Sequence, residues 1–190
     1  GFGHIKIRAG YGVEEDIAFT RQLREVLGDS FGLMVDAHWG YTLNQAKALA
    51  KGLEDLGVLF LEAPLPPEDY EAHRELRLFT RIDIALGEAE RNRFQFKEIL
   101  NSRAADLIQP DIGRVGITEF LRIAHLAEVY GVRVAPHLST HHGLATAASI
   151  HLSAAMPNLF MLEYQPVSLK MANQFLREPI QCERGSFIIP

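Results

Sequence analysis

Short runs of apolar and β-branched residues alternate along this chain with longer segments of helical periodicity. The alternation has a period of about 25 to 30 residues, which is the length of one strand–helix unit. Strands joined by helices in this way run parallel to one another, because each helix returns the chain to the end of the sheet at which the previous strand began. The sequence therefore predicts an α/β fold, with strands at residues 4–8, 32–36, 58–62, 83–87, 106–109, 132–136 and 159–163.

Amphipathic segments fill the spaces between these strands and predict the connecting helices. Thr42 is a suitable N-cap for one of them, and Gly57 and Gly131 lie where helices commonly end. The predicted helices cover residues 14–27, 43–56, 68–79, 94–101, 116–130 and 141–155.

Two architectures fit this alternation: an open doubly wound sheet and a closed (β/α)8 TIM barrel. A dinucleotide-binding open sheet requires a glycine-rich turn after its first strand, and neither "GFGHIK" nor "GRVGI" has that pattern. A barrel places functional groups at the C-terminal ends of many strands, as this sequence does. We therefore predict an incomplete (β/α)8 barrel of about seven strand–helix units, with the first strand missing.

Every predicted strand ends at or next to an ionisable side chain. A single carboxylate in such a position is equally well explained as a helix cap or a solvated loop residue, and a single histidine more often has a structural role. Burying so many charges is costly unless they are paired or bind a metal, so the repetition favours a shared site. The residues are Lys6, Arg8, Asp36, His38, Glu62, Glu88, Asp111, His137 and Glu163.

Three of these carboxylates, Asp36, Glu62 and Glu88, follow three successive strands. Neighbouring parallel strands lie about 4.8 Å apart, so carboxylates at adjacent strand ends repel each other unless a cation lies between them. Oxygen donors of this kind suit Mg²⁺ better than zinc, which favours histidine and cysteine. The trio is therefore a candidate Mg²⁺ site.

Composition excludes several classes of protein. The 19 basic and 24 acidic residues give a net charge of −5, which argues against a nucleic-acid-binding surface. No apolar segment approaches the roughly 20 residues that span a membrane, and no signal peptide is visible. The single cysteine, Cys182, suits a reducing compartment, so we expect a cytoplasmic protein. Because the chain opens at Gly1, we expect the start of a longer protein to be missing.

Seven motifs occur in an order and at a spacing that resemble a known family. The motifs are "IKIR", "VDAHWG", "FLEAPLPP", "LGEAE", "IQPDIGRVGIT", "VAPHLSTHHG" and "MLEYQP". Together they resemble the catalytic barrel of the mandelate racemase/muconate lactonising enzyme branch of the enolase superfamily. The resemblance implies a partial barrel over residues 1–166 and a tail, 167–190, that returns toward a missing N-terminal capping domain.

The resemblance also implies an activity and a set of roles. Family members use Mg²⁺ and abstract the proton α to a carboxylate. The metal ligands correspond to Asp36, Glu62 and Glu88. The histidine–aspartate pair corresponds to His137 and Asp111, and the acid beside the substrate carboxylate corresponds to Glu163. Lys6 and Arg8 correspond to two lysines of the family pattern.

The departure at Arg8 bears on the type of reaction. Arginine stays protonated and is a poor second base, which disfavours two-base racemisation. It suits a clamp on a substrate oxygen or carboxylate, or simple neutralisation of the acidic strand ends. The D-x-H sequence of Asp36 and His38 is similar to that of sugar-acid dehydratases, so His38 is expected to protonate the leaving hydroxyl and His137 to act as the base. The expected product is a 2-keto-3-deoxy sugar acid.

Two alternatives remain open at this stage. One is a racemase, epimerase or cycloisomerase of the same branch, and the other is a non-catalytic barrel fragment. His141 and His142 are weaker candidates for substrate contacts, and Trp39 and Tyr41 fit either a pocket wall or the core. The expected partner is a small carboxylate substrate, without nucleic acid or membrane, and the full-length protein is expected to form a homo-oligomer.

Overall fold

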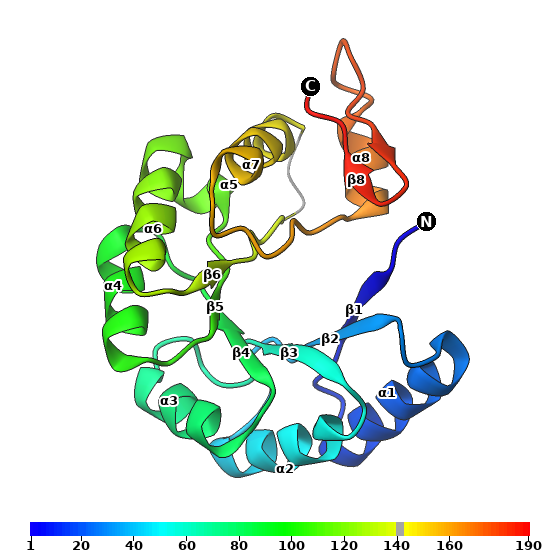
Figure 1. Cartoon of the computed structure of the whole chain (residues 1–190), viewed down its shortest axis with the longest axis vertical. Coiled ribbons are helices and arrows are strands. Elements are labelled where there is room, and N and C mark those ends of the chain that lie inside the picture. Colours follow the sequence, from blue (N-terminus) through cyan, green and yellow to red (C-terminus); the bar gives the residue numbers. More distant parts are fainter. Residues whose placement is uncertain (140–142) are drawn as a thin grey trace. The chain divides into compact units, whose positions relative to one another are not determined.

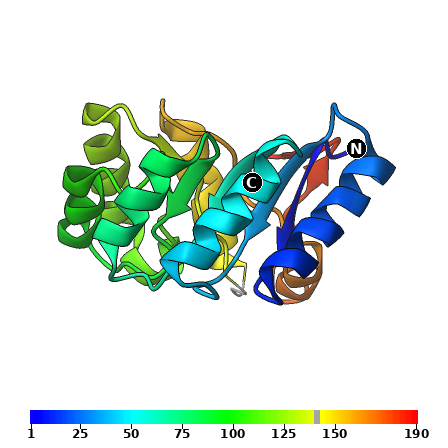
Figure 2. The same cartoon turned by 90° about the horizontal axis from the view of Figure 1, so that it is seen from below.

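The computed structural model describes residues 1–139 and 143–190 (Figures 1 and 2). Two compact units are present. The N-terminal unit comprises Phe2–Leu86 and Asn101–Asp106, and the C-terminal unit comprises Gly1, Gly87–Leu100 and Leu107–Pro190. No helix in the described part of the chain has both the length and the apolar character needed to cross a membrane.

The N-terminal unit repeats strand and helix as the sequence predicts. Its strands run parallel and pair in chain order. Figure 1 shows the three helices along one side of these strands. The elements are β1 (His4–Arg8), α1 (Val13–Leu27), β2 (Gly32–Asp36), α2 (Leu43–Glu54), β3 (Val58–Glu62), α3 (Tyr70–Phe79) and β4 (Asp83–Leu86).

Local sequence explains these elements well. Leu33 and Val35 of β2 are fully buried, and the apolar positions of α2 repeat at helical spacing on its buried face. Thr42 and Gln45 form a capping box at the start of α2. Gly57 has a φ of 62°, which ends the helical segment without the strain that a side chain would add.

The C-terminal unit contains shorter strands and more helix. Strands β5 and β6 pair in parallel, and β7 and β8 form a small antiparallel hairpin. Helix α4 (Arg93–Ser102) contributes all but its last two residues to this unit. The other elements are β5 (Leu107–Ile108), α5 (Ile112–Val115), α6 (Ile117–Val129), β6 (Arg133–Val134), α7 (Leu144–Ala155), α8 (Pro166–Ala172), β7 (Cys182–Glu183) and β8 (Ser186–Phe187).

The segment predicted as a seventh strand, residues 159–163, is not a strand. Its backbone pairs at one bridge, between Val134 and Leu159, where Phe160 donates to the Val134 carbonyl. Beyond that point the segment bonds through side chains instead of continuing the ladder, as described below. The α/β class and the parallel strands are confirmed, and the described residues form part of a barrel without closing one.

The predicted tail, 167–190, packs within the C-terminal unit. Leu169 of α8 and Ile180 form a buried cluster with Ile150 of α7. Burial of these side chains holds α8 and the segment before β7 to the rest of this unit. The division of the chain at residue 166 stays a prediction.

Candidate functional site

Ionisable side chains gather at the ends of β1, β2 and β3 in the N-terminal unit. The strand register places Arg8 opposite Asp36, and Asp36 opposite Glu62. Asp36 is 7% exposed and Glu62 is fully buried. Two carboxylates at adjacent strand ends, shielded from water, repel each other strongly unless cations balance them.

Two basic side chains of β1 provide part of that balance. The Lys6 Nζ lies 2.7 Å from the Glu62 Oε2, and the Arg8 Nη1 lies 3.0 Å from the Asp36 Oδ2. Lys6 and Arg8 share one face of the strand because they are two residues apart. We call Lys6, Arg8, Asp36 and Glu62 the N-terminal cluster, and each was predicted from its position at a strand end.

His38 lies beyond the end of β2, in a turn. Its φ is 43° and that of Trp39 is 62°, both in the left-handed region, and their rings stack with centroids 4.2 Å apart. The His38 backbone N–H donates to the Asp36 Oδ1 at 3.0 Å, and the His38 side chain is exposed. The D-x-H spacing does not place His38 on the same strand face as Asp36, because side chains alternate regularly only while the backbone stays extended. Its catalytic role stays a prediction.

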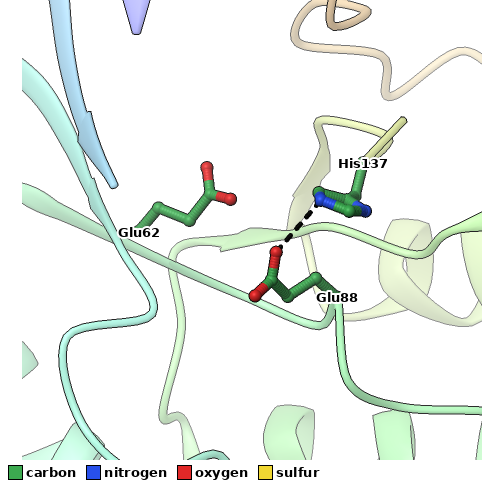
Figure 3. A group of neighbouring side chains, drawn as sticks. All are labelled: Glu62, Glu88 and His137. Carbon is green, nitrogen blue, oxygen red and sulfur yellow. Dashed lines mark ion pairs between the residues drawn. The ribbon is translucent and has the colours of Figure 1, made fainter. Parts of the chain in front are cut away.

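The C-terminal unit contains a second group around His137. The imidazole Nδ1 lies 2.8 Å from the Asp111 Oδ2, and the Nε2 lies 3.0 Å from the Glu88 Oε2 (Figure 3). Asp111 is fully buried and Glu88 nearly so. A parallel bridge between Asp111 and His137 aligns their backbones. The ring is therefore held by a carboxylate at each nitrogen.

These carboxylates change the acid–base properties of His137. Burial of the ring opposes its protonation, but the hydrogen bonds to Asp111 and Glu88 and the charge of Glu163 outweigh burial and raise the pKa of His137 to about 10. With all three carboxylates ionised, the ring is protonated at neutral pH.

Gly87 allows Glu88 to reach this position from the end of β4. Its φ is 130°, and a Cβ at this residue would lie 2.6 Å from the Phe96 ring and 2.9 Å from the Gln109 backbone nitrogen. Only glycine tolerates both the conformation and the close approach.

Glu163 contacts the backbone next to His137. Its Oε2 accepts a hydrogen bond from the Leu138 N–H at 2.8 Å, and the Gln165 amide donates to the Leu138 carbonyl. The N–H and the carbonyl of Leu138 are thus both hydrogen-bonded to side chains that follow β6 in the chain. We call Glu88, Asp111, His137 and Glu163 the C-terminal cluster.

Sequence reasoning missed Ser139, whose backbone N–H and hydroxyl both donate to the Asp111 Oδ2. The available signal was its position two residues after His137, since alternate residues of an extended segment face the same side. His141 and His142 lie outside the described residues.

Tyr41 belongs to the core and not to a pocket wall. Its side chain is buried and its hydroxyl donates to the buried Asp16 carboxylate. Burial and this contact with Asp16 raise the pKa of Tyr41 to about 12, so the phenol remains a donor.

Apart from His38, the predicted site residues thus form two clusters, each within its own unit. The grouping of Asp36 and Glu62 with Glu88 around one ion stays a prediction. Within each cluster, buried carboxylates lie against cationic or titratable partners, an arrangement suited to proton transfer and to binding a hard cation.

Comparison with known proteins identifies relatives over the whole chain. The profile of the family described as "Enolase C-terminal domain-like" matches residues 1–190. The chain is 34% identical over 199 residues to D-galactarolactone cycloisomerase of Agrobacterium fabrum, covering 100% of this chain and 52% of the relative. It is 34% identical over 194 residues to D-xylonate dehydratase of Haloferax volcanii, covering 99% and 47%.

A solved structure is also similar to this chain over its whole length. The crystal structure of L-talarate dehydratase from Polaromonas sp. JS666, complexed with Mg and L-glucarate, is 33% identical with a TM-score of 0.87 and covers 100% of this chain and 51% of that one. The chain spans about half the length of the curated relatives that it matches.

Proposed function

Because this chain belongs to the enolase C-terminal domain-like family, we propose that the full-length protein is a Mg²⁺-dependent sugar-acid dehydratase. The observation that carries the proposal is the His137–Asp111 pair: a half-buried imidazole is oriented through its Nδ1, so that its Nε2 can exchange a proton. Relatives named as dehydratases of xylonate, arabinonate and galactonate support the substrate class.

Asp36, Glu62 and Glu88 are the proposed ligands of Mg²⁺. The donor set fits this ion, because it consists of buried carboxylate oxygens, two of which lie on adjacent strand ends. When bound, the ion stabilises negative charge on the substrate carboxylate as the α-proton leaves. Lys6 adds a fixed positive charge beside Glu62, and Arg8 is proposed to bind a substrate oxygen.

His137 is the proposed base. The proton on the α-carbon passes to the His137 Nε2, and the electron pair of the broken C–H bond moves into the carboxylate to form an enediolate. To accept a proton, the ring must start neutral. Asp111, Glu88 and Glu163 together raise the pKa of the ring, and engagement of Glu88 as a metal ligand would remove its share of that effect.

His38 is the proposed acid of the second step. The enediolate electrons form a carbon–carbon double bond as the β-hydroxyl leaves, and His38 donates the proton that converts this hydroxyl to water. The exposed ring at the end of β2 is compatible with access to substrate. The resulting enol becomes a 2-keto-3-deoxy acid.

A cycloisomerase is the second candidate, favoured by the identity with D-galactarolactone cycloisomerase. Both reactions begin with the same α-proton abstraction, so the residues of the two clusters serve either. Two-base racemisation is disfavoured, because Arg8 is a permanent cation paired with Asp36.

The full-length protein should be incubated with Mg²⁺ and a panel of hexonates, pentonates and aldarates, with detection of 2-keto-3-deoxy products. We expect turnover of at least one acid and its loss in His137→Asn. Turnover of a sugar-acid lactone without loss of water would favour the cycloisomerase instead. If neither the sugar acids nor sugar-acid lactones react, both candidate functions are refuted.

A further inference from the structure

We propose that Ser139 is a positioning residue, which orients His137 by sharing the Asp111 carboxylate with it. This inference rests on the proposed function, in which His137 is the base. Ser139 contacts no group proposed to bind the metal in the described structure, and its hydroxyl and backbone N–H both face Asp111.

The argument begins with the two oxygens of Asp111. The Oδ1 accepts the Gly113 N–H at 2.7 Å, at the start of α5. The Oδ2 accepts the His137 Nδ1 at 2.8 Å and the Ser139 N–H at 3.2 Å, and it also accepts the Ser139 hydroxyl. This fully buried carboxylate thus accepts from at least four donors among the described residues, three of which share one oxygen.

Three donors on one oxygen compete, because a carboxylate oxygen has two lone pairs. The Ser139 hydroxyl therefore limits how strongly Asp111 binds the imidazole proton. It also prevents Asp111 from turning about its side-chain bonds, since Oδ1 is held from the opposite side by Gly113. When the ring is neutral, Asp111 favours the tautomer with the proton on Nδ1, and Nε2 is directed away from Asp111.

The backbone on either side of Ser139 is fixed independently of its hydroxyl. Glu163 and Gln165 bind the Leu138 N–H and carbonyl, and the Ser139 N–H binds Asp111 without help from the side chain. Removing the hydroxyl should therefore leave the fold of the segment intact. The variant changes only the number of donors to the Asp111 Oδ2, which loses the Ser139 hydroxyl.

A spectroscopic test needs neither substrate nor metal. The imidazole N–H proton between His137 and Asp111 should be observed by NMR on ¹⁵N-histidine-labelled full-length protein and assigned by its absence in His137→Asn. We expect Ser139→Ala to shift this resonance, because the Asp111 Oδ2 then has one donor fewer and is no longer held in place by the Ser139 hydroxyl. Ser139→Thr, which keeps a hydroxyl, should leave it unchanged.

A kinetic test uses exchange of the substrate α-hydrogen in D₂O, with a sugar acid identified from the panel. We expect Ser139→Ala to lower the maximal exchange rate about 10-fold with KM unchanged, the lower end of the effect of a hydrogen bond to a charged group. Ser139→Thr should restore the rate. Ser153→Ala is the matched control, because this buried hydroxyl has no hydrogen-bond partner among the described residues.

Two outcomes would overturn the inference: an imidazole resonance that does not move in Ser139→Ala, or a Ser139→Thr variant that behaves like Ser139→Ala. If no sugar acid reacts, the proposed function fails, but the resonance still decides the role of Ser139. The two failures are therefore separable.

Discussion

Asp36 and Glu62 lie directly opposite one another, as the last residues of β2 and β3. Both are buried, and each is paired with a cation from β1. Two ionised carboxylates in this position destabilise each other, and ion pairs with Lys6 and Arg8 offset part of that repulsion. This geometry is expected of a site that binds a cation, and it leads to the first prediction.

Glu62→Gln and Asp36→Asn should each weaken Mg²⁺ binding by at least about 100-fold, because each removes one charged oxygen ligand. Isothermal titration calorimetry on the full-length protein measures this. Glu71→Gln is the control, since the Glu71 side chain on α3 is 79% exposed. Unchanged Mg²⁺ affinity in both site variants would exclude these residues as ligands.

His38→Gln should separate the two steps of the proposed reaction. Elimination of water should fall about 100-fold or more, the usual contribution of a general acid, while α-hydrogen exchange continues. The measurement compares product formation with deuterium incorporation in D₂O. His151→Gln, an exposed position on α7, should affect neither rate. If His38→Gln abolishes exchange together with elimination, the separate roles of His38 and His137 are wrong.

Tyr41→Phe should lower the free energy of unfolding by about 1–3 kcal/mol, because it leaves the buried Asp16 carboxylate with one donor fewer. The Gly10 N–H, at 2.7 Å, still donates to the Asp16 carboxylate in this variant. Urea denaturation measures the change. Tyr11→Phe controls for loss of a tyrosine hydroxyl at a residue that is 77% exposed, and an equal loss in both variants would contradict a specific Tyr41–Asp16 contact.

We expect the ionisation of Glu54 to make the free energy of unfolding fall at acid pH. Its carboxylate accepts from the Arg81 N–H, from Lys51 and from Thr80, and these contacts lower its pKa from 4.5 to about 2. A group whose pKa is lowered by folding stabilises the protein above its unfolded pKa, and that contribution disappears as the pH falls from 4.5 toward 2.

Urea unfolding over this pH range should therefore show Glu54→Gln to be less stable than the wild type near pH 7 and similar to it near pH 2. Glu25→Gln, at an exposed position on α1, should follow the wild-type curve throughout. A constant difference between Glu54→Gln and the wild type at every pH would show that the ionisation of Glu54 is not the cause.

Arg24 joins the ends of α1 and α2. Its guanidinium donates to four backbone carbonyls, those of Gly28, Phe31, Leu56 and Gly57. Arg24→Ala should destabilise the protein by about 2 kcal/mol, and Arg24→Lys should recover only part of this, because an ammonium cannot reproduce the planar fork of donors. Thermal unfolding measures both. Full recovery with lysine would argue against the forked contacts, and Arg21→Ala, exposed on the same helix, is the control.

Most of the N-terminal unit was predictable from the sequence. Strands β1, β2 and β3 begin and end where the apolar runs do, and Thr42 caps α2 as expected. These features are local: side-chain alternation and capping depend on residues within a few positions of one another. The ionisable residues of both clusters were predicted from a signal that is also local, their positions at or near the ends of the predicted strands.

The contacts that give those residues their chemistry were not predictable. The turn at His38 depends on backbone angles that alternation does not reveal. The segment 159–163 has a strand-like sequence but pairs at one bridge, and beyond it the Glu163 side chain binds the Leu138 N–H. The sequence leaves Tyr41 equally suited to a pocket wall and to the core, and only its contact with Asp16 decides between them.

The sequence by itself determined which residues stand at the strand ends, because hydrophobic periodicity and helix caps act over short stretches of chain. Only the tertiary structure decided that Ser139 shares Asp111 with His137 and that Lys6 reaches Glu62. These partners are separated by 28 and 56 positions in the chain. A hydrogen bond or ion pair depends on distance in space, and the folded backbone alone sets that distance.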